Sequence, residues 1–274
     1  MTARRSFSDG TDGAGVVPFL YASGSTHLAA FLFARFLGEM ELYVGTSGYS
    51  YKEWKGSFYP EDLPAKDMLS YYGERLSAVE INNTFYRLPK ASVLESWAGQ
   101  VPDGFRFSIK ASRRITHFAR LKDEARDPTD YLLSTVEALG PKLGVILFQM
   151  PPNLKADVPR LEAFLSLLPA GTPGAFEFRH ESWKDDAVYD ALRARAMAWV
   201  CADTDESEAD EPVLSTAPWG YLRLRRPDYG DGDLERWVGR VEGTGWEKAF
   251  VFFKHEDEGA GPKLAASFVA LAGA

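Results

Sequence analysis

The stretch that decides the fold is Val79-Glu-Ile-Asn-Asn-Thr-Phe-Tyr86. Side chains alternate across a β-strand, so Val79 and Ile81 form an apolar face while Glu80 and Asn82 point to the other side. Burying an ionised carboxylate without a partner costs several kcal/mol. If Glu80 lies on the inner side of a sheet, neighbouring strands must therefore supply cations and hydrogen-bond donors.

Further β-rich runs alternate with helical patterns along the chain. The predicted strands cover residues 42–47, 78–84, 105–111, 144–150, 174–179, 198–203, 220–225 and 248–254. The predicted helices cover residues 63–76, 92–100, 128–139, 158–168, 185–197, 233–241 and 262–271. Between Asp203 and Gly220 the chain is acidic and is interrupted by Pro212 and Pro218, so we expect the sixth helix to be short or missing.

This alternation predicts an α/β fold, a single (β/α)₈ barrel of the TIM type over residues 40–274 with a degenerate sixth helix. A doubly wound open sheet is the alternative. Polar residues follow nearly all of the strands, which favours the barrel because an open sheet gathers its ligand residues at one switch point. No Gly-x-Gly-x-x-Gly motif follows the first strand, so the dinucleotide-binding fingerprint is absent.

Residues 1–39 are predicted to be a non-core N-terminal extension, either disordered or the product of a misassigned start, because Met40 directly precedes the first strong strand. The apolar run Leu28–Leu37 is too short for a membrane span, and no small-residue cleavage site follows it. We therefore expect no membrane association. The single cysteine, Cys201, fits a reducing compartment and a cytoplasmic location.

Charged residues gather on one face of the predicted strands when the more apolar face of each strand is assigned to the helices. In the strand 198–203 this rule turns Val200 outward and Asp203 inward. The full inward set is Glu80, Asn82, Lys110, Gln149, Glu177, Arg179, Asp203, Arg223, Arg225 and Lys254. Its three carboxylates face five cations, and this surplus of two positive charges favours an anionic ligand such as a phosphate or carboxylate.

The types and positions of these residues suggest roles at the C-terminal mouth of the barrel, where barrel active sites are built. Glu80 or Glu177 is expected to move a proton, with Asp203 as a second carboxylate. Lys110 suits either a Schiff base or phosphate binding, and the sequence does not distinguish the two. The predicted ligand-binding residues are Ser47, Tyr49, Asn82, Tyr86, Gln149, Arg179, His180, Trp183, Arg223, Arg225, Lys254 and His255.

Two groups of loop residues allow both a functional and a structural interpretation. Aromatic residues after the strands, such as Tyr49 and Trp183, either stack on a ligand or pack on one another as a lid. His117, His180 and His255 each follow a strand and suit either acid–base chemistry or a structural role as solvent-facing or capping residues. No metal or other cofactor is expected, because Lys and Arg outnumber the acids in the inward set.

Several motifs are specific enough to indicate a family. They are Val44–Trp54, Phe58-Tyr-Pro60, Val79–Tyr86, Phe105–Lys110, Leu147–Pro152 and Phe176–Trp183. From about Leu42 to the C-terminus, the chain resembles the YecE-like family of domains of unknown function. The resemblance implies a (β/α)₈ barrel and supplies no activity. Where many members carry a His-Gly pair after the seventh strand this chain has Arg225-Arg-Pro227, and where many carry an Asn-rich segment after the eighth it has Phe253-Lys-His-Glu256.

The sequence thus predicts an enzyme, a metal-independent hydrolase or lyase, that acts on a small anionic, phosphorylated substrate. The alternative is a nucleic-acid-binding or nucleic-acid-processing protein, in which the inner cations contact phosphates and the loop aromatics stack on bases. The net charge of −8 argues against a general nucleic-acid binder. A third reading is a non-catalytic scaffold. The oligomeric state does not follow from the sequence.

Overall fold

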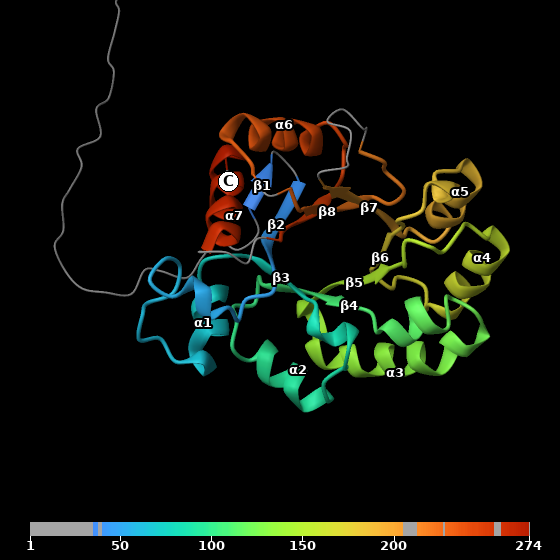
Figure 1. Cartoon of the computed structure of the whole chain (residues 1–274), viewed down its shortest axis with the longest axis horizontal. Helices are drawn as coiled ribbons and strands as arrows, with labels where there is room; N and C mark the ends of the chain where they lie inside the picture. The colour runs from blue at the N-terminus through green and yellow to red at the C-terminus, as the bar shows by residue number, and fades with distance from the viewer. Residues whose placement is uncertain (1–34, 38–39, 205–212, 227, 255–258, 274) are drawn as a thin grey trace, which may run out of the picture. The chain divides into compact units, whose positions relative to one another are not determined.

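A computed structural model of the chain describes residues 35–37, 40–204, 213–226, 228–254 and 259–273 (Figure 1). All of them belong to one compact unit, Leu32–Ala274. Within these ranges no helix has the length and apolarity that crossing a bilayer requires.

Eight parallel strands form a closed barrel, which confirms the predicted fold. They are β2 (Met40–Ser47), β3 (Ala78–Ile81), β4 (Arg106–Lys110), β5 (Leu143–Gln149), β6 (Gly174–Glu177), β7 (Ala198–Asp203), β8 (Trp219–Leu224) and β9 (Lys248–Phe253). Each strand pairs with the next along the chain, and β2 also pairs in parallel with β9, where Val44 lies opposite Val251. This last pairing closes the ring, so the C-terminal ends of all eight strands meet at one mouth.

Seven α-helices accompany the strands (Figure 1) among the described residues. They are α1 (Met68–Gly73), α2 (Ala91–Ala98), α3 (Arg126–Val136), α4 (Val158–Leu167), α5 (Asp186–Arg193), α6 (Asp231–Glu242) and α7 (Ala260–Leu271). Between β7 and β8 the described residues contain no helix, in agreement with the degenerate sixth helix. Side-chain caps fix two helix starts, since Asp157 accepts from the Arg160 N–H at 3.1 Å and Asp185 from the Ala187 N–H at 2.9 Å.

A short strand precedes the barrel. Residues Arg35–Leu37 form β1 and pair antiparallel with β2, with Arg35 opposite Leu42. These three residues fall within the predicted extension 1–39, and the rest of that extension lies outside the described residues.

Apolar side chains fill both the barrel interior and the layer between strands and helices. Val79, Phe107 and Leu222 pack in the layer between strands and helices, as predicted. The barrel interior is also apolar below the mouth, where Tyr43, Leu147, Val200, Tyr221, Phe250 and Phe252 belong to one buried cluster. The predicted orientation of β7 is therefore wrong. Val200 points into the barrel. The rule fails here because parallel strands that are buried on both sides carry apolar residues on both faces.

Candidate functional site

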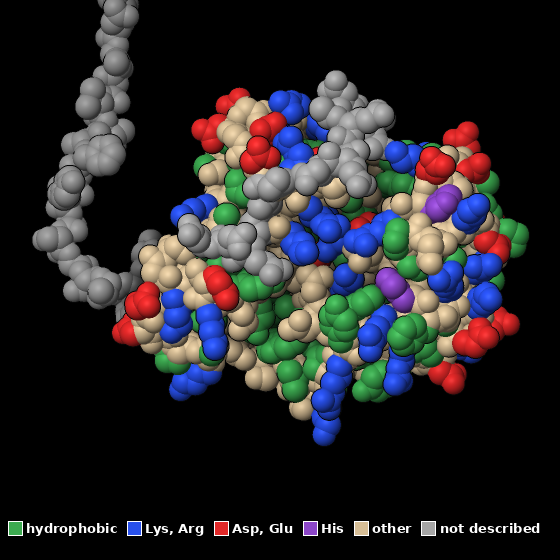
Figure 2. Space-filling view, in the orientation of Figure 1, with side chains coloured by type: hydrophobic (Ala, Val, Ile, Leu, Met, Phe, Trp, Pro, Cys, Tyr) green, Lys and Arg blue, Asp and Glu red, His purple; other side chains and the backbone are tan. Residues whose placement is uncertain are grey.

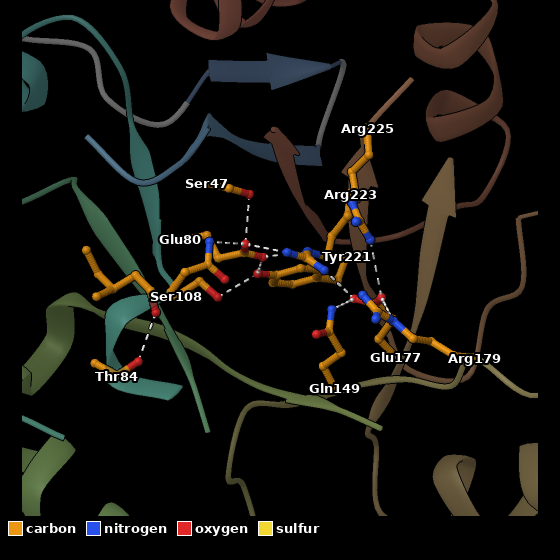
Figure 3. Close-up of polar contacts among 12 residues, drawn as sticks. Ser47, Glu80, Thr84, Ser108, Gln149, Glu177, Arg179, Tyr221, Arg223 and Arg225 are labelled. Atoms are coloured by element: carbon orange, nitrogen blue, oxygen red, sulfur yellow. Dashed lines mark hydrogen bonds and ion pairs between the residues drawn. The ribbon is translucent and has the colours of Figure 1, made fainter. Parts of the chain in front are cut away.

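Arg223 of β8 is the centre of the polar cluster at the mouth (Figure 3). Its Nε donates to Oε2 of Glu80 at 2.9 Å, and a terminal nitrogen donates to Oε1 of the same carboxylate at 2.8 Å. The other terminal nitrogen donates to Oε2 of Glu177 at 2.5 Å. All three residues are at most 2% exposed. One guanidinium thus joins two buried carboxylates from opposite sides of the ring through its rigid fork of donors.

Further donors saturate the Glu80 carboxylate. Ser47 Oγ donates to Oε1 at 2.8 Å and Asn82 Nδ2 at 3.1 Å, while the Tyr221 hydroxyl donates to Oε2 at 2.7 Å. Asn82 reaches Glu80 although β3 ends at Ile81, because the chain turns into a helical conformation at Asn82. Burial opposes ionisation, but the Arg223 charge and these hydrogen bonds hold the pKa of Glu80 below its usual value.

The Glu177 carboxylate is equally occupied. Its Oε2 accepts from Gln149 Nε2 at 2.8 Å in addition to Arg223, and its Oε1 accepts from Arg179 Nε at 3.1 Å. A terminal nitrogen of Arg225 lies 3.7 Å from Oε1. Burial again opposes ionisation, yet the charges of Arg223 and Arg179 lower the pKa of Glu177 to about 2. Both carboxylates are therefore ionised at neutral pH, and their oxygens are already in use.

Three cations next to these buried carboxylates remain accessible. The Arg179 side chain is 32% exposed and that of Arg225 24% exposed. The Arg225 Nε is itself buried and donates no hydrogen bond to any described residue. The Lys110 ammonium lies 4.8 Å from the Phe85 ring and forms no ion pair within the described part of the chain. Burial, followed by the charge of Arg223, lowers the pKa of Lys110 to about 8.

The cluster has the predicted surplus of two positive charges, although it contains fewer charged residues than predicted. Two carboxylates, Glu80 and Glu177, face the cations Lys110, Arg179, Arg223 and Arg225, which leaves two positive charges in excess. Figure 2 shows Lys and Arg side chains gathered over the middle of the ring of strands, with hydrophobic side chains beside them. An excess of cations around a partly enclosed mouth attracts anions.

Asp203 and Lys254 do not join this cluster, contrary to the sequence prediction. Because β7 is turned the other way, the Asp203 carboxylate lies in the helix layer. There it accepts from the Trp237 indole of α6 at 3.1 Å and from the Tyr229 hydroxyl at 2.8 Å, and it pairs with Arg226 at 3.1 Å. Lys254 is exposed after β9, and its side chain makes no ion pair with the described carboxylates of the mouth.

Three predicted ligand residues of the loops have their contacts away from the cluster. Trp183 is 1% exposed, stacks on Phe178 and donates its indole N–H to the Leu154 carbonyl. His180 Nδ1 accepts from the Ser182 N–H at 3.1 Å and so caps a short 3₁₀ turn. Tyr49 packs near Tyr72 of α1. His255 lies outside the described residues.

The remaining one, Tyr86, is 68% exposed on the rim of the mouth. The loop that carries it is fixed to β4, because the Thr84 hydroxyl contacts the carbonyl of Lys110 at 2.7 Å. Phe85 of this loop contacts both neighbours, since its ring lies 4.8 Å from the Lys110 ammonium and 5.1 Å from the Tyr86 ring.

The predicted site residues omit Tyr221, which contacts the cluster, whereas His117 is one of the loop histidines considered for acid–base chemistry. Tyr221 bridges Glu80 and the Ser108 hydroxyl, which lies 2.7 Å from the Tyr221 oxygen, and its signal was its shared strand face with Arg223. His117 lies in a π-helical turn, Arg114–Phe118, with its ring 4.8 Å from Phe85. Burial and the charges of Lys110 and Arg179 lower the pKa of His117. Among the described His, Cys, Asp and Glu residues, no group of three is placed to hold a metal ion.

These features define a (β/α)₈-barrel protein with a cationic, carboxylate-anchored cluster at the C-terminal mouth. The chain belongs to the family described as "Protein of unknown function DUF72", whose model matches residues 43–274. The YecE-like resemblance is thereby confirmed.

Two bacterial proteins named UPF0759 are similar to this chain in sequence. The UPF0759 protein YunF of Bacillus subtilis is 28% identical over 222 residues, which cover 76% of this chain and 73% of YunF. The UPF0759 protein YecE of Escherichia coli K12 is 27% identical over 177 residues, or 62% of each chain. This chain thus aligns with less than two thirds of YecE.

Crystal structures of family members have the same fold. A DUF72 protein from Thermotoga maritima superposes with a TM-score of 0.71 at 24% identity, covering 85% of this chain and 99% of that one. A DUF72 protein from Enterococcus faecalis gives a TM-score of 0.70 at 16% identity, covering 85% and 96%. At these identities the comparison establishes the fold alone.

Proposed function

We propose that the mouth of the barrel binds a small anionic ligand, a phosphorylated metabolite, through Arg179, Arg225 and Lys110. The observation that carries the proposal is the surplus of two positive charges over the two buried carboxylates. The buried Nε of Arg225, which has no acceptor among the described residues, supports it further. A buried donor without an acceptor is costly, and a ligand oxygen would satisfy it.

The buried layer beneath supports binding by fixing the cations in place. Glu177 contacts Arg179, Arg223 and Arg225, so one carboxylate orients three guanidiniums. Such preorganisation lowers the entropic cost of binding, because the side chains are already ordered. We assign Glu80 and Glu177 this positioning role in place of the proton transfer that the sequence suggested.

Lys110 is the residue that we assign to proton transfer. Its pKa of about 8 lies near neutrality, which suits a group that must both give and take a proton. His117, whose ring also contacts Phe85, is a second titratable group near Lys110. Hydrolysis or elimination next to a bound anion needs one such proton carrier, so the proposal extends to an enzyme of the hydrolase or lyase class.

Calorimetric titration tests the binding. The wild type is titrated with inorganic phosphate and a panel of phosphorylated sugars, alongside Arg225→Ala and, as the matched control, Arg193→Ala. Arg193 is also an exposed arginine with a carboxylate partner at 2.8 Å, but it lies at the end of α5. Loss of one charge-assisted hydrogen bond predicts roughly tenfold weaker binding for Arg225→Ala and no change for the control. Equal affinities in all three proteins would overturn the proposal.

A nucleic-acid ligand is the second candidate, because exposed aromatic rings lie beside arginines at the rim. Arg113 lies 5.5 Å from the Tyr86 ring and 5.2 Å from the Phe118 ring. Salt dependence separates the two candidates. Binding of an oligonucleotide through six or more phosphates should weaken by roughly 10³-fold or more between about 50 and 200 mM salt, whereas a single phosphate group responds much less.

A further inference from the structure

A groove of about 900 Å³ lies on the rim, separate from the ion-pair cluster. Its walls come from the segments that follow β3 and β4 and from the start of α3. The residues that matter for its chemistry are Tyr86, Arg87, Arg114, Phe118, Lys122 and Tyr131. This volume is typical of sites that hold one small molecule.

Exposed aromatic rings are concentrated in this groove. Among the described residues, five large apolar side chains are notably exposed, and three of them line it: Tyr86 at 68%, Phe118 at 67% and Tyr131 at 55%. The guanidinium of Arg113 lies within 5.5 Å of both the Tyr86 and the Phe118 rings, so a cation–π contact links these two rings. Exposed apolar side chains that gather in one groove are a feature of ligand-binding sites.

The groove also contains cations that form no ion pair within the described part of the chain. Arg87, Arg114 and Lys122 form no ion pair with the carboxylates that share the walls, Glu124 and Asp127, nor with other acids in the described ranges. The groove therefore combines unpaired cations with open aromatic faces. That combination suits a ligand that is both planar and anionic.

Phe85 connects the groove with the mouth. Its ring lies 4.8 Å from the Lys110 ammonium and 5.1 Å from the Tyr86 ring, so the Tyr86 ring lies within about 10 Å of that ammonium. His117 contacts Phe85 and is followed directly by Phe118. A single small molecule can therefore reach from Lys110 to the aromatic rings.

We propose that the groove binds the planar ring of a nucleotide-sized ligand whose phosphate is held at the mouth. This inference deepens the proposed function and rests on it for the position of the phosphate. The ring stacks on Tyr86 and Phe118, and the groove cations lie along its edge. The groove's volume and the net charge of −8 favour one mononucleotide over a polynucleotide.

The test compares ligands that differ only in the ring. AMP, UMP, ribose 5-phosphate and inorganic phosphate are titrated into the full chain by calorimetry. Stacking on an aromatic side chain predicts that AMP binds roughly 5- to 100-fold more tightly than ribose 5-phosphate. The double variant Tyr86→Ala, Phe118→Ala should lose this advantage and keep the affinity for ribose 5-phosphate. Val93→Ala, an exposed apolar residue of α2 outside the groove, is the control and should change neither.

Each outcome separates this inference from the proposed function. Equal affinity for AMP and ribose 5-phosphate overturns the groove proposal while leaving the anion site intact. AMP binding that persists in Arg225→Ala but fails in the double variant supports the groove and contradicts the phosphate site at the mouth. Binding of a ten-nucleotide oligothymidylate together with no binding of AMP or UMP overturns the small-ligand assignment in favour of a polynucleotide.

Discussion

Arg223 and Lys110 are two cations of one mouth with opposite tasks. Arg223 is 2% exposed and uses its fork on two carboxylates, so it has little left for a ligand. Removing one member of such a buried group is expected to destabilise the fold strongly, whereas the group as a whole contributes little net stability. Among the described residues Lys110 forms no ion pair with a carboxylate, and its ammonium lies 4.8 Å from the Phe85 ring. Both side chains are cationic. Their partners decide that Arg223 orients the buried carboxylates and that Lys110 is available to a ligand.

The pH dependence of binding tests the role of Lys110. Its pKa of about 8 lies below the usual value, so the ammonium loses its proton as the pH rises through about 8. An anion is then held by one cation fewer, and its affinity should fall by roughly tenfold between pH 7 and 9.5. Lys110→Arg, which keeps its charge, should bind with little dependence on pH over this range. Calorimetric titration of sulfate, an anion whose charge stays constant over this range, measures both at several pH values.

An unchanged affinity of the wild type from pH 7 to 9.5 would contradict the assignment. Lys110→Met serves as the control for loss of the charge at all pH values. It should bind at pH 7 as weakly as the wild type does at pH 9.5.

At the scale of elements, one helix residue joins two strands where their pairing begins. The Tyr72 hydroxyl of α1 accepts from the Thr46 N–H at 2.8 Å and donates to the Ala78 carbonyl at 2.9 Å. It reaches this position because Gly45 has no side chain. A Cβ at Gly45 would lie 1.7 Å from the Ala78 carbonyl oxygen and 2.8 Å from the Tyr72 hydroxyl. The start of the β2–β3 pairing thus depends on a glycine and a tyrosine from different elements.

Substitution at Gly45 should therefore be severe. Gly45→Ala forces backbone apart from backbone, so we expect a loss in the free energy of unfolding above the roughly 1–3 kcal/mol typical of overpacked side chains. Tyr72→Phe should lose about 1–3 kcal/mol, because it leaves a buried donor and acceptor unpaired. Gly232→Ala is the control, since a Cβ there meets nothing within 4 Å. Urea denaturation of the four proteins measures the differences, and a Gly45→Ala variant as stable as the control would contradict this account.

The strand faces show what the sequence could predict and why the rest escaped it. In β3 and β8 the inward residues Glu80 and Arg223 were predicted correctly, because they form an ion pair with each other inside the barrel. In β7 the rule failed, because Val200 packs inside an apolar barrel interior and Asp203 finds its partners outside. The alternation of apolar and polar residues is informative only where one of the two faces is polar.

The loops after the strands were less predictable than the strands. Trp183 and Tyr86 both follow strand ends, yet one is 1% and the other 68% exposed. Trp183 is directed by its packing against Phe178, and Tyr86 by a loop that is hydrogen-bonded to β4. Neither contact produces a recognisable pattern in the local sequence. His117 reaches the mouth through a π-helical turn, a conformation without a sequence signal of its own.

At the scale of the whole molecule, a net charge of −8 coexists with a mouth that is positive by two. Acids on the outer surface therefore keep polyanions away, while a small anion inside the mouth meets mainly cations. The same two carboxylates that organise this mouth also make the stability of the whole barrel depend on pH, because they tie together strands β3, β6 and β8.

Acid should therefore unfold the protein through its buried pairs. Glu177 has a pKa of about 2, against 4.5 for an ordinary glutamate, and the pKa of Glu80 is lowered too. The unfolded chain takes up these protons first, so the stabilisation is complete above about pH 4.5 and is lost as the pH falls from there toward 2. For Glu177 alone the loss is on the order of 3 kcal/mol. Urea denaturation at pH 7, 5, 4 and 3 should show it.

Glu177→Gln tells this mechanism apart from general acid denaturation. The variant lacks the titrating group, so it should start less stable at neutral pH and lose about 2 kcal/mol less than the wild type between pH 7 and 3, since the full loss is reached only at lower pH. An exposed glutamate that pairs only with its neighbour, Glu74 beside Arg75, gives the control Glu74→Gln, which should follow the wild-type curve. If Glu177→Gln and the wild type lose the same free energy between pH 5 and 3, the buried cluster does not govern acid stability, and the positioning role of Glu177 at the mouth becomes untenable with it.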